Sequence, residues 1–310
     1  LKREDLYHLI EYGAEQGLRM ATIPAATDRL TESVITRLKA AGLRQMALSI
    51  DFPTAEKHDA FRGVPGAFDR TMRAVSWAHE HRLPLQVNTT LCAESLPYLE
   101  PMVELVNDLD IVFWEVFFLV PMGRGCGLEG LTAGQCEEAF EVLYKAQKEA
   151  DFLVKVTEAP HFRRYVVCRE WEATGRAAGS RVGDQDLPAQ LVRTEGPGHT
   201  IGRASRGVNA GNGFLFVSHT GEVFPSGFLP LPAGDVRRQG LASIYRDSEL
   251  FRKLRRPETF HGICGRCEFN RICGGSRSRA FALTGDYLGS DPWCAYRPGQ
   301  HVAGGRTESL

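Results

Sequence analysis

The segment QMALSIDFPTAEKHDAFRGVPGAFDRTMRAVSWAHEHRLPLQVNTTL, residues 45–91, contains the pattern that decides the fold. Its two ends, 45–51 and 85–91, are short and rich in apolar or β-branched residues, as buried strands are. Between them, residues 66–82 have apolar positions at helical spacing. Two strands joined by a helix form a βαβ unit, so the strands are predicted to run parallel in one sheet.

The same alternation extends on both sides of that segment. Strands are predicted at 18–24, 111–120 and 152–157, and helices at 5–17, 31–42, 96–109 and 132–150. Strands separated by helices predict an α/β fold with a parallel sheet. We interpret this half as part of a TIM-type barrel. The rival is an open doubly wound sheet, which is disfavoured because no G-x-G-x-x-G follows an early strand.

The composition is that of an ordinary globular protein. The chain has 310 residues, of which 43% are hydrophobic and 24% charged, and its net charge is −1. Because there is no basic excess, nucleic acid is not expected as a partner. No apolar run reaches the ~18 residues of a membrane span, and no signal peptide precedes the first helix. The eight cysteines favour metal or redox chemistry over disulfides, and we expect a cytoplasmic protein with no membrane partner.

The periodic pattern ends near residue 165. Residues 166–212 are rich in Gly, Arg, Ser and Asn and are predicted to be an irregular linker or loop. The stretch FLFVSHTGEVFPSG, residues 214–227, predicts a β-hairpin with Gly221 in its turn. A helix is predicted over 241–254. The expected domains are a partial barrel at 1–165, the irregular segment at 166–212, and a small α+β domain at 213–310.

Four cysteines of the last domain have the spacing C-x2-C-x5-C-x20-C; they are Cys264, Cys267, Cys273 and Cys294. A C-x2-C pair can bring two sulfurs onto one ion or cluster. A structural zinc site usually has two such pairs, and the second is missing here. A [4Fe–4S] cluster takes four thiolates with irregular spacing. The spacing therefore favours a cluster and leaves zinc open.

Longer segments around these residues resemble one family. CGRCEFNRICGGSRSRAFALTGDYLGSDPWC, residues 264–294, resembles the C-terminal SPASM/twitch region of radical SAM enzymes, which cleave S-adenosylmethionine (SAM) reductively. ALSIDFPTAEKHDAFRGVPGAFD, residues 47–69, resembles the family's fourth-strand segment, and LKREDLYHLIEYG, residues 1–13, resembles the helix after its G-G-E-P segment. The resemblance covers nearly the whole chain and is nearest to relatives that act on heme precursors and to peptide-modifying maturases. It implies a (β/α)6 radical SAM barrel followed by a twitch domain with a β-hairpin and an auxiliary cluster.

The chain departs from the family pattern at two places. The C-x3-C-x2-C motif that holds the SAM-cleaving [4Fe–4S] cluster is absent, and we interpret this as an N-terminal truncation that removes the first strands of the barrel. Full SPASM domains hold two auxiliary clusters, but Ser226 and Arg277 stand where further cysteines would be. The resemblance therefore implies a single auxiliary [4Fe–4S] cluster on the four cysteines of the last domain.

The resemblance also implies residues for SAM and substrate. The SAM contacts would come from strand ends and the segments after them: Ser49, Asp51, Arg62, Asn88, Pro121 and Gly123. Glu158 and His161, beyond the last strand, are candidates for substrate contact or proton transfer. Arg193, Arg203 and Arg206 are candidates for binding carboxylates. The alternative for each residue is structural: a strand-end cap, a surface ion pair or a satisfied core side chain.

The implied activity of the intact protein is radical chemistry with SAM. One electron from a donor protein of the flavodoxin or ferredoxin type would yield a 5′-deoxyadenosyl radical, which takes a hydrogen from a peptide or a tetrapyrrole-like carboxylate. Oxidation, decarboxylation and bond formation are all left open. Residues 1–310 alone are expected not to cleave SAM, because they lack C-x3-C-x2-C. The alternative is a non-catalytic, peptide-binding scaffold in which a four-thiolate zinc domain follows a degenerate barrel.

Overall fold

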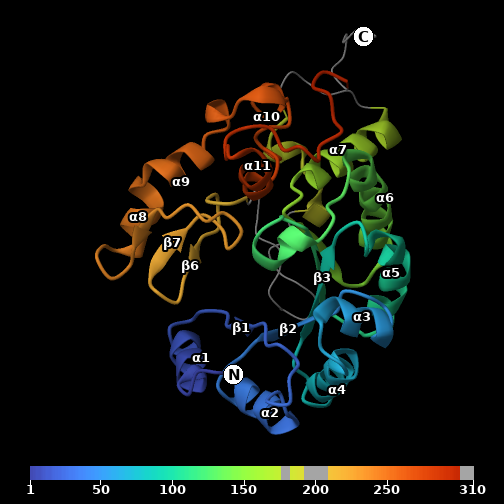
Figure 1. Cartoon of the computed structure of the whole chain (residues 1–310), viewed down its shortest axis with the longest axis vertical. Helices are drawn as coiled ribbons and strands as arrows, with labels where there is room; N and C mark the ends of the chain where they lie inside the picture. Colours follow the sequence, from blue (N-terminus) through green and yellow to red (C-terminus); the bar gives the residue numbers. More distant parts are fainter. Residues whose placement is uncertain (176–181, 192–208, 301–310) are drawn as a thin grey trace. The chain divides into compact units, whose positions relative to one another are not determined.

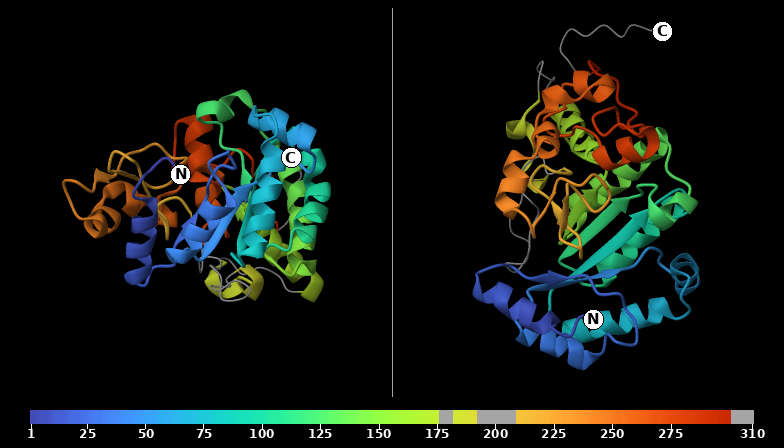
Figure 2. Two further views of the ribbon diagram at one scale, coloured as in Figure 1. Left: turned by 90° about the horizontal axis from the view of Figure 1, so that it is seen from below. Right: turned by 60° about the vertical axis from the view of Figure 1, so that its left-hand side comes forward.

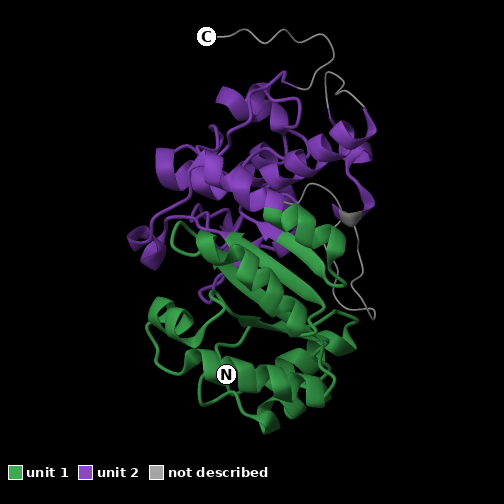
Figure 3. Ribbon diagram, turned by 90° about the vertical axis from the view of Figure 1, so that its right-hand side faces the viewer, with its two compact units in different colours: residues 1–117, 142–155, 193–203 green, residues 118–141, 156–192, 204–310 purple. Residues whose placement is uncertain are grey.

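The computed structural model describes residues 1–175, 182–191 and 209–300. These residues form two compact units, coloured separately in Figure 3. Among the described residues, unit 1 contains 1–117 and 142–155, and unit 2 contains 118–141, 156–175, 182–191 and 209–300. The three-part division at residues 165 and 212 stays a prediction.

Unit 1 is built on the predicted sheet. Its strands are β1 (Ala21–Thr22), β2 (Gln45–Ser49), β3 (Leu85–Leu91), β4 (Phe113–Phe118) and β5 (Leu153–Thr157), which lie in that order across the sheet. β1 pairs parallel with β2, and β2 pairs parallel with β3. Consecutive strands are neighbours, as successive βαβ units require. The five strands confirm the expected α/β fold class.

Helices alternate with these strands as predicted (Figure 1). They are α1 (Leu6–Glu15), α2 (Glu32–Ala40), α4 (Ala67–Glu80), α5 (Leu99–Asp108, preceded by the 3-10 turn Leu96–Tyr98) and α6 (Ala133–Glu149). The buried residues of α4 are spaced three or four apart on one face, and α4 packs on β2 and β3 (Figure 2). The Thr31 hydroxyl accepts a hydrogen bond from Val34 N and caps α2.

The structure contains elements that the apolar pattern does not reveal. α3 (Ala55–Arg62) buries only His58, so it has no apolar stripe. α7 (His161–Thr174) continues into the segment that was expected to be irregular from residue 166, and that expectation is wrong as far as Thr174. β8 (Gly234–Asp235) is too short to leave a periodic signal.

Unit 2 contains the small antiparallel sheet. β6 (Phe216–Val217) and β7 (Glu222–Phe224) form the predicted hairpin, and β8 pairs with β7. The helix expected at 241–254 is divided into α8 (Leu241–Asp247) and α9 (Glu249–Leu254), because Ser248 has a non-helical backbone. Small apolar clusters centred on Leu229 and Val223 hold these elements together.

Unit 2 also contains α10 (Gly262–Arg266) and α11 (Arg277–Thr284). Cys264 lies in α10, Cys267 and Cys273 lie between the two helices, and Cys294 follows α11. The Ser276 hydroxyl accepts from Arg279 N and caps α11, which ends at Gly285. Among the described helices, none is both long and apolar enough to cross a membrane.

Candidate functional site

Four cysteines line one cavity in unit 2. Cys264, Cys267, Cys273 and Cys294 line this cavity together with Gly274 and Gly275. Cys264 lies in α10, Cys267 directly follows that helix, and Cys273 ends a turn in which its N–H donates to Phe269 O at 2.9 Å. The structure thus brings together the four residues that the spacing grouped.

The backbone beside this cavity is glycine for a steric reason. Gly275 has a φ of +67°, and a Cβ there would lie 3.0 Å from Cys264 Sγ and 2.7 Å from Asp291 Cβ. Gly275 N–H donates to Cys273 Sγ at 3.4 Å, and Asp291 N–H donates to Cys264 Sγ at the same distance. Hydrogen bonds of this kind accompany iron–sulfur ligation. The donor set and these N–H groups therefore fit a [4Fe–4S] cluster.

The thiols of Cys267, Cys273 and Cys294 are held neutral by their surroundings. Burial raises the pKa of Cys267 to about 12 and that of Cys294 to about 11, and it raises the pKa of Cys273 well above its ordinary value. Within the described residues, no three His, Cys, Asp or Glu side chains are grouped so that they could hold a single metal ion. A bound cation reverses the preference for neutral thiols, because a coordinating thiol is deprotonated outright.

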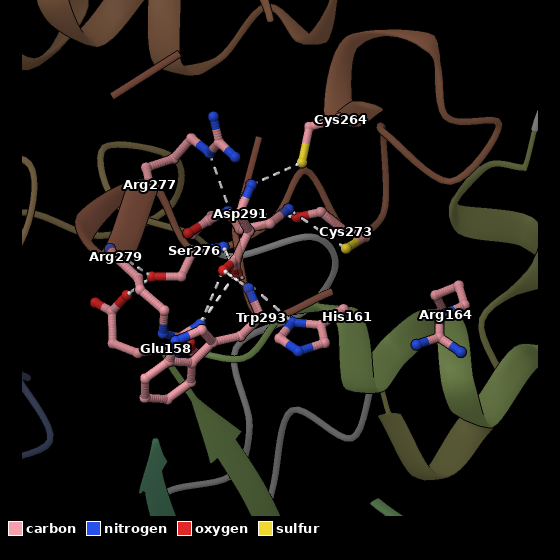
Figure 4. A network of polar contacts seen from close by, with 12 residues as sticks. Glu158, His161, Arg164, Cys264, Cys273, Ser276, Arg277, Arg279, Asp291 and Trp293 are labelled. Atoms are coloured by element: carbon pink, nitrogen blue, oxygen red, sulfur yellow. Dashed lines mark hydrogen bonds and ion pairs between the residues drawn. The ribbon is translucent and has the colours of Figure 1, made fainter. Parts of the chain in front are cut away.

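A buried ion pair borders the cavity (Figure 4). Arg279 Nη1 lies 3.0 Å from Asp291 Oδ2, and both side chains are 0% exposed. The Asp291 carboxylate also accepts from Ser276 N at 2.7 Å and from Trp293 N at 3.1 Å. Burial by itself would raise the pKa of Asp291, but Arg279 and these N–H groups together lower it. Both members of the pair are therefore charged.

Glu158 belongs to the same network. It has a φ of +59°, which is uncommon outside glycine. Its carboxylate accepts from the hydroxyls of Ser276 at 2.5 Å, Ser278 at 3.0 Å and Ser226 at 3.3 Å, and its carbonyl accepts from Arg279 Nη2. Ser226, at a position where fuller SPASM domains have cysteine, thus binds a carboxylate of its own chain. These contacts favour the structural interpretation of Glu158.

His161, the first residue of α7, is 0% exposed. In the described part of the chain neither ring nitrogen has a hydrogen-bond partner, and Nδ1 lies 3.8 Å from Asp291 Oδ2. The ring packs edge-on against Phe140, and burial lowers its pKa to about 3. His161 is a neutral core side chain, and its burial favours the structural alternative over contact with substrate.

In unit 1, candidate SAM residues lie together at the end of β2 and in the middle of β3. Ser49 is the partner of Asn88 across the two strands. Asp51 is fully buried, with Oδ2 2.5 Å from Arg62 Nε and with Oδ1 accepting from Thr90 N at 2.9 Å. The Arg62 side chain is 35% exposed. Asp51 therefore holds Arg62 in place, and Arg62 is the member of the pair that reaches the surface.

The H-D-x-x-R-G segment that follows β2 has a structural explanation at each polar position. His58 Nδ1 accepts from Asp51 N at 3.2 Å, and burial lowers the pKa of His58, so its ring is neutral. Asp59 accepts from Gly66 N at 2.5 Å and from Phe68 N at 2.8 Å, and it holds the start of α4. Both contacts stabilise the backbone that places Arg62.

A polar chain across the sheet contains only one residue of the sequence-based set, Asn88. Gln86 Nε2 donates to Asn88 Oδ1 at 2.7 Å and to Glu115 Oε2 at 2.9 Å, and Gln45 Nε2 donates to Gln86 Oε1 at 2.8 Å. Lys155 Nζ lies 2.6 Å from Glu115 Oε1. The sequence signal for this polar chain is the repeat of polar residues at every second position of β3, at Gln86, Asn88 and Thr90. This repeat places the three side chains on one face of the sheet.

The other candidates lie apart from this group in the chain. Pro121 and Gly123 follow β4 and belong to unit 2. The Pro121 carbonyl accepts from Cys126 Sγ at 3.3 Å, and Gly123 has a φ of +54° with nothing within 4 Å of a Cβ. Arg193, Arg203 and Arg206 lie outside the described residues.

Comparison with models of protein families finds no match. Comparison with known proteins finds extensive similarity. The chain is 37% identical over 300 residues to the AdoMet-dependent heme synthase of Methanosarcina barkeri, across 97% of this chain and 81% of that protein. It is 27% identical over 302 residues to the PqqA peptide cyclase of Rhizobium meliloti, across 96% of this chain and 72% of that protein.

Among solved structures, SuiB of Streptococcus suis is similar at a TM-score of 0.64 and 13% identity, across 95% of this chain and 64% of SuiB. That likeness concerns the fold alone, and it agrees with the barrel and twitch architecture expected from the sequence. The 37% identity extends over nearly the whole chain. The chain therefore belongs to the AdoMet-dependent heme synthase family of radical SAM enzymes.

Proposed function

We propose that this chain takes part in SAM-dependent radical chemistry on a heme-pathway tetrapyrrole that carries carboxylate side chains. The observation that carries the proposal is the 37% identity with a heme synthase over 97% of the chain. A peptide is the second candidate substrate, because the similarity to a peptide cyclase covers 96% of the chain at 27% identity.

In this proposal the chain's own residues bind and orient SAM. When bound, SAM and a reducing cluster supply the radical that takes hydrogen from substrate. Arg62 would hold the SAM carboxylate, because a planar guanidinium matches a carboxylate with two hydrogen bonds. Asp51 would orient Arg62, and Ser49 and Asn88 would offer polar groups at paired positions of adjacent strands. The backbone near Pro121 and Gly123 would lie by the adenine.

Binding of SAM to Arg62 can be measured by calorimetry with SAM as the titrant. Arg62→Lys keeps the charge but loses the paired donors, so affinity should fall by at least about tenfold, because a hydrogen bond to a charged group contributes about 1.5–3 kcal/mol. Asp51→Asn should also weaken binding, because Arg62 loses its partner. Arg73→Lys, an exposed change on α4, is the control. Equal affinities for Arg62→Lys and Arg73→Lys would exclude Arg62 as a ligand.

We also propose that Cys264, Cys267, Cys273 and Cys294 hold one auxiliary [4Fe–4S] cluster. Anaerobic reconstitution with iron and sulfide should give a brown protein with about four irons per chain, and Cys267→Ala should lose them. A colourless protein with one equivalent of zinc would instead support the four-thiolate zinc scaffold.

Residues 1–310 by themselves are proposed not to cleave SAM, because they contain no C-x3-C-x2-C. The reconstituted chain, incubated with SAM and dithionite, should form no 5′-deoxyadenosine. Dithionite replaces the flavodoxin- or ferredoxin-type donor in this assay. Formation of 5′-deoxyadenosine would contradict the assignment of the four cysteines to an auxiliary role.

The substrate class can be tested by binding. A porphyrin with four propionate side chains should bind, as followed by its visible absorption, and its tetramethyl ester should bind much more weakly because the carboxylates are blocked. Tight binding of the ester would show that carboxylates are not recognised. Binding of a PqqA-type peptide without binding of the porphyrin would favour the peptide candidate.

A further inference from the structure

The ion pair between Arg279 and Asp291 is fully buried, and further hydrogen bonds fix its geometry. Each Asp291 oxygen has two partners: Oδ2 accepts from Ser276 N at 2.7 Å and from Arg279 Nη1 at 3.0 Å, and Oδ1 accepts from Trp293 N at 3.1 Å and from the same Nη1 at 3.3 Å. Both side chains are 0% exposed. Such a buried pair stabilises a protein little by itself, since desolvation offsets most of its attraction. Stability alone therefore does not account for the fixed geometry of this pair.

The backbone of Asp291 contacts two of the cavity's cysteines. Its N–H donates to Cys264 Sγ at 3.4 Å, and its carbonyl accepts from Cys294 N at 3.3 Å. A Cβ at Gly275 would lie within 3.0 Å of both Cys264 Sγ and Asp291 Cβ, so this sulfur and the Cβ of Asp291 both lie against Gly275. The side chain of Asp291 thus fixes the peptide groups that bind the sulfur and place the fourth cysteine.

Arg279 anchors the other end of the pair. Its Nη2 donates to Glu158 O at 2.5 Å, its Nε donates to Leu119 O at 3.4 Å, and its guanidinium lies 4.0 Å from the centre of the Trp293 ring. Through Arg279, Asp291 is thereby linked to Glu158, the residue that follows β5. Removal of either partner would leave the other as a buried, uncompensated charge.

We propose that Arg279 and Asp291 are positioning residues of the cluster bound by the four cysteines, and that their opposite fixed charges set its reduction potential. This inference rests on the proposed [4Fe–4S] cluster. Reduction adds one electron to the cluster, so a nearby carboxylate disfavours it and a nearby guanidinium favours it. Cluster potentials respond to such charges and to hydrogen bonds on sulfur.

The test compares variants of the reconstituted chain by an anaerobic redox titration followed by electron paramagnetic resonance. Asp291→Asn keeps the side chain's volume and should raise the potential. Arg279→Met should lower it. Each change is expected to shift the one-electron equilibrium about tenfold, which is about 59 mV. Arg169→Met, an exposed change on α7, should leave the potential unaltered.

Shifts in opposite directions, with about four irons retained, support the charge assignment, because loss of structure alone would not invert the sign. Equal potentials in Asp291→Asn and the unaltered chain overturn it. If Arg279→Met does not retain iron, Arg279→Lys provides the second measurement. A potential equal to that of the unaltered chain supports the proposal, and a lower potential overturns it.

The same experiment separates this inference from the proposed function. An unaltered chain that holds no four-iron cluster rejects the proposed function. A four-iron cluster whose potential is the same in all variants rejects only the role of Arg279 and Asp291.

Discussion

Replacement of Gly275 by alanine tests the steric account of the cysteine cavity. Gly275 has a φ of +67°, and the added Cβ would lie 2.7 Å from Asp291 Cβ, 2.8 Å from Arg277 Nη2 and 3.0 Å from Cys264 Sγ. Gly285, at the end of α11, offers a matched control. It has a similar φ of +76°, but nothing lies within 4 Å of a Cβ there.

The expected cost follows from these two geometries. A left-handed backbone costs a non-glycine residue about 1–2 kcal/mol, and this applies to both variants. Only Gly275→Ala adds overpacking, which costs about 1–3 kcal/mol more. The neighbours are poorly placed to yield, because Arg277 is fully buried and Asp291 is held by Arg279. Gly275→Ala should therefore destabilise the chain by about 2–5 kcal/mol and Gly285→Ala by about 1–2 kcal/mol.

Two measurements check this difference. Anaerobic urea unfolding of the iron-free variants gives the free energies of unfolding, and iron analysis after reconstitution gives cluster occupancy. Gly285→Ala should retain about four irons per chain, whereas Gly275→Ala should retain fewer because Cys264 is displaced. Equal stability and equal iron content in the two variants would refute the steric reasoning.

Two further predictions concern unit 1. The buried Thr89 hydroxyl accepts from Trp114 Nε1 at 2.9 Å, so Thr89→Val should cost about 1–3 kcal/mol by leaving the indole N–H without an acceptor. Thr89→Val should cost less stability in a Trp114→Phe background, because phenylalanine has no N–H to leave without an acceptor. A double-mutant cycle in which the two effects are strictly additive would contradict this. The N–H groups of Phe68 and Gly66 lower the pKa of Asp59 from its ordinary 3.8, so its stabilising effect is present above pH 3.8 and is lost as the pH falls through the lowered value. Asp59→Asn should be less stable than the unaltered chain at neutral pH, with a difference that shrinks in acid; a difference independent of pH in urea unfolding would count against the assignment.

The local patterns of the sequence were sufficient for the main elements because each has its own period. Residues 66–82 repeat at helical spacing and residues 85–91 form a short run rich in apolar and β-branched residues, and both lie where α4 and β3 are found. The C-x2-C-x5-C-x20-C spacing likewise grouped four cysteines that line one cavity. α3 escaped notice because it buries only His58, so its helical period carries no apolar signal.

The roles of polar side chains depended on partners that are distant in the chain. Asp51 and Arg62 are candidates for SAM binding by resemblance, but only the folded chain reveals that Asp51 is buried and holds Arg62. Glu158 and His161 lie beyond a strand end, where substrate contacts are expected in a barrel. The structure surrounds Glu158 with three serine hydroxyls and encloses His161 completely.

The run Ser-Arg-Ser-Arg at 276–279 is the clearest case in which burial could not be predicted from the sequence. By itself such a run is typical of a solvated helix face, yet all four residues are 0% exposed. Their partners include Glu158, more than a hundred residues earlier in the chain, and Asp291. The sequence by itself determined the main strands and helices and the cysteine set, because these follow from backbone geometry and ligand spacing. Tertiary structure alone decided which charges are buried, because a buried charge is tolerated only where the fold brings it a partner.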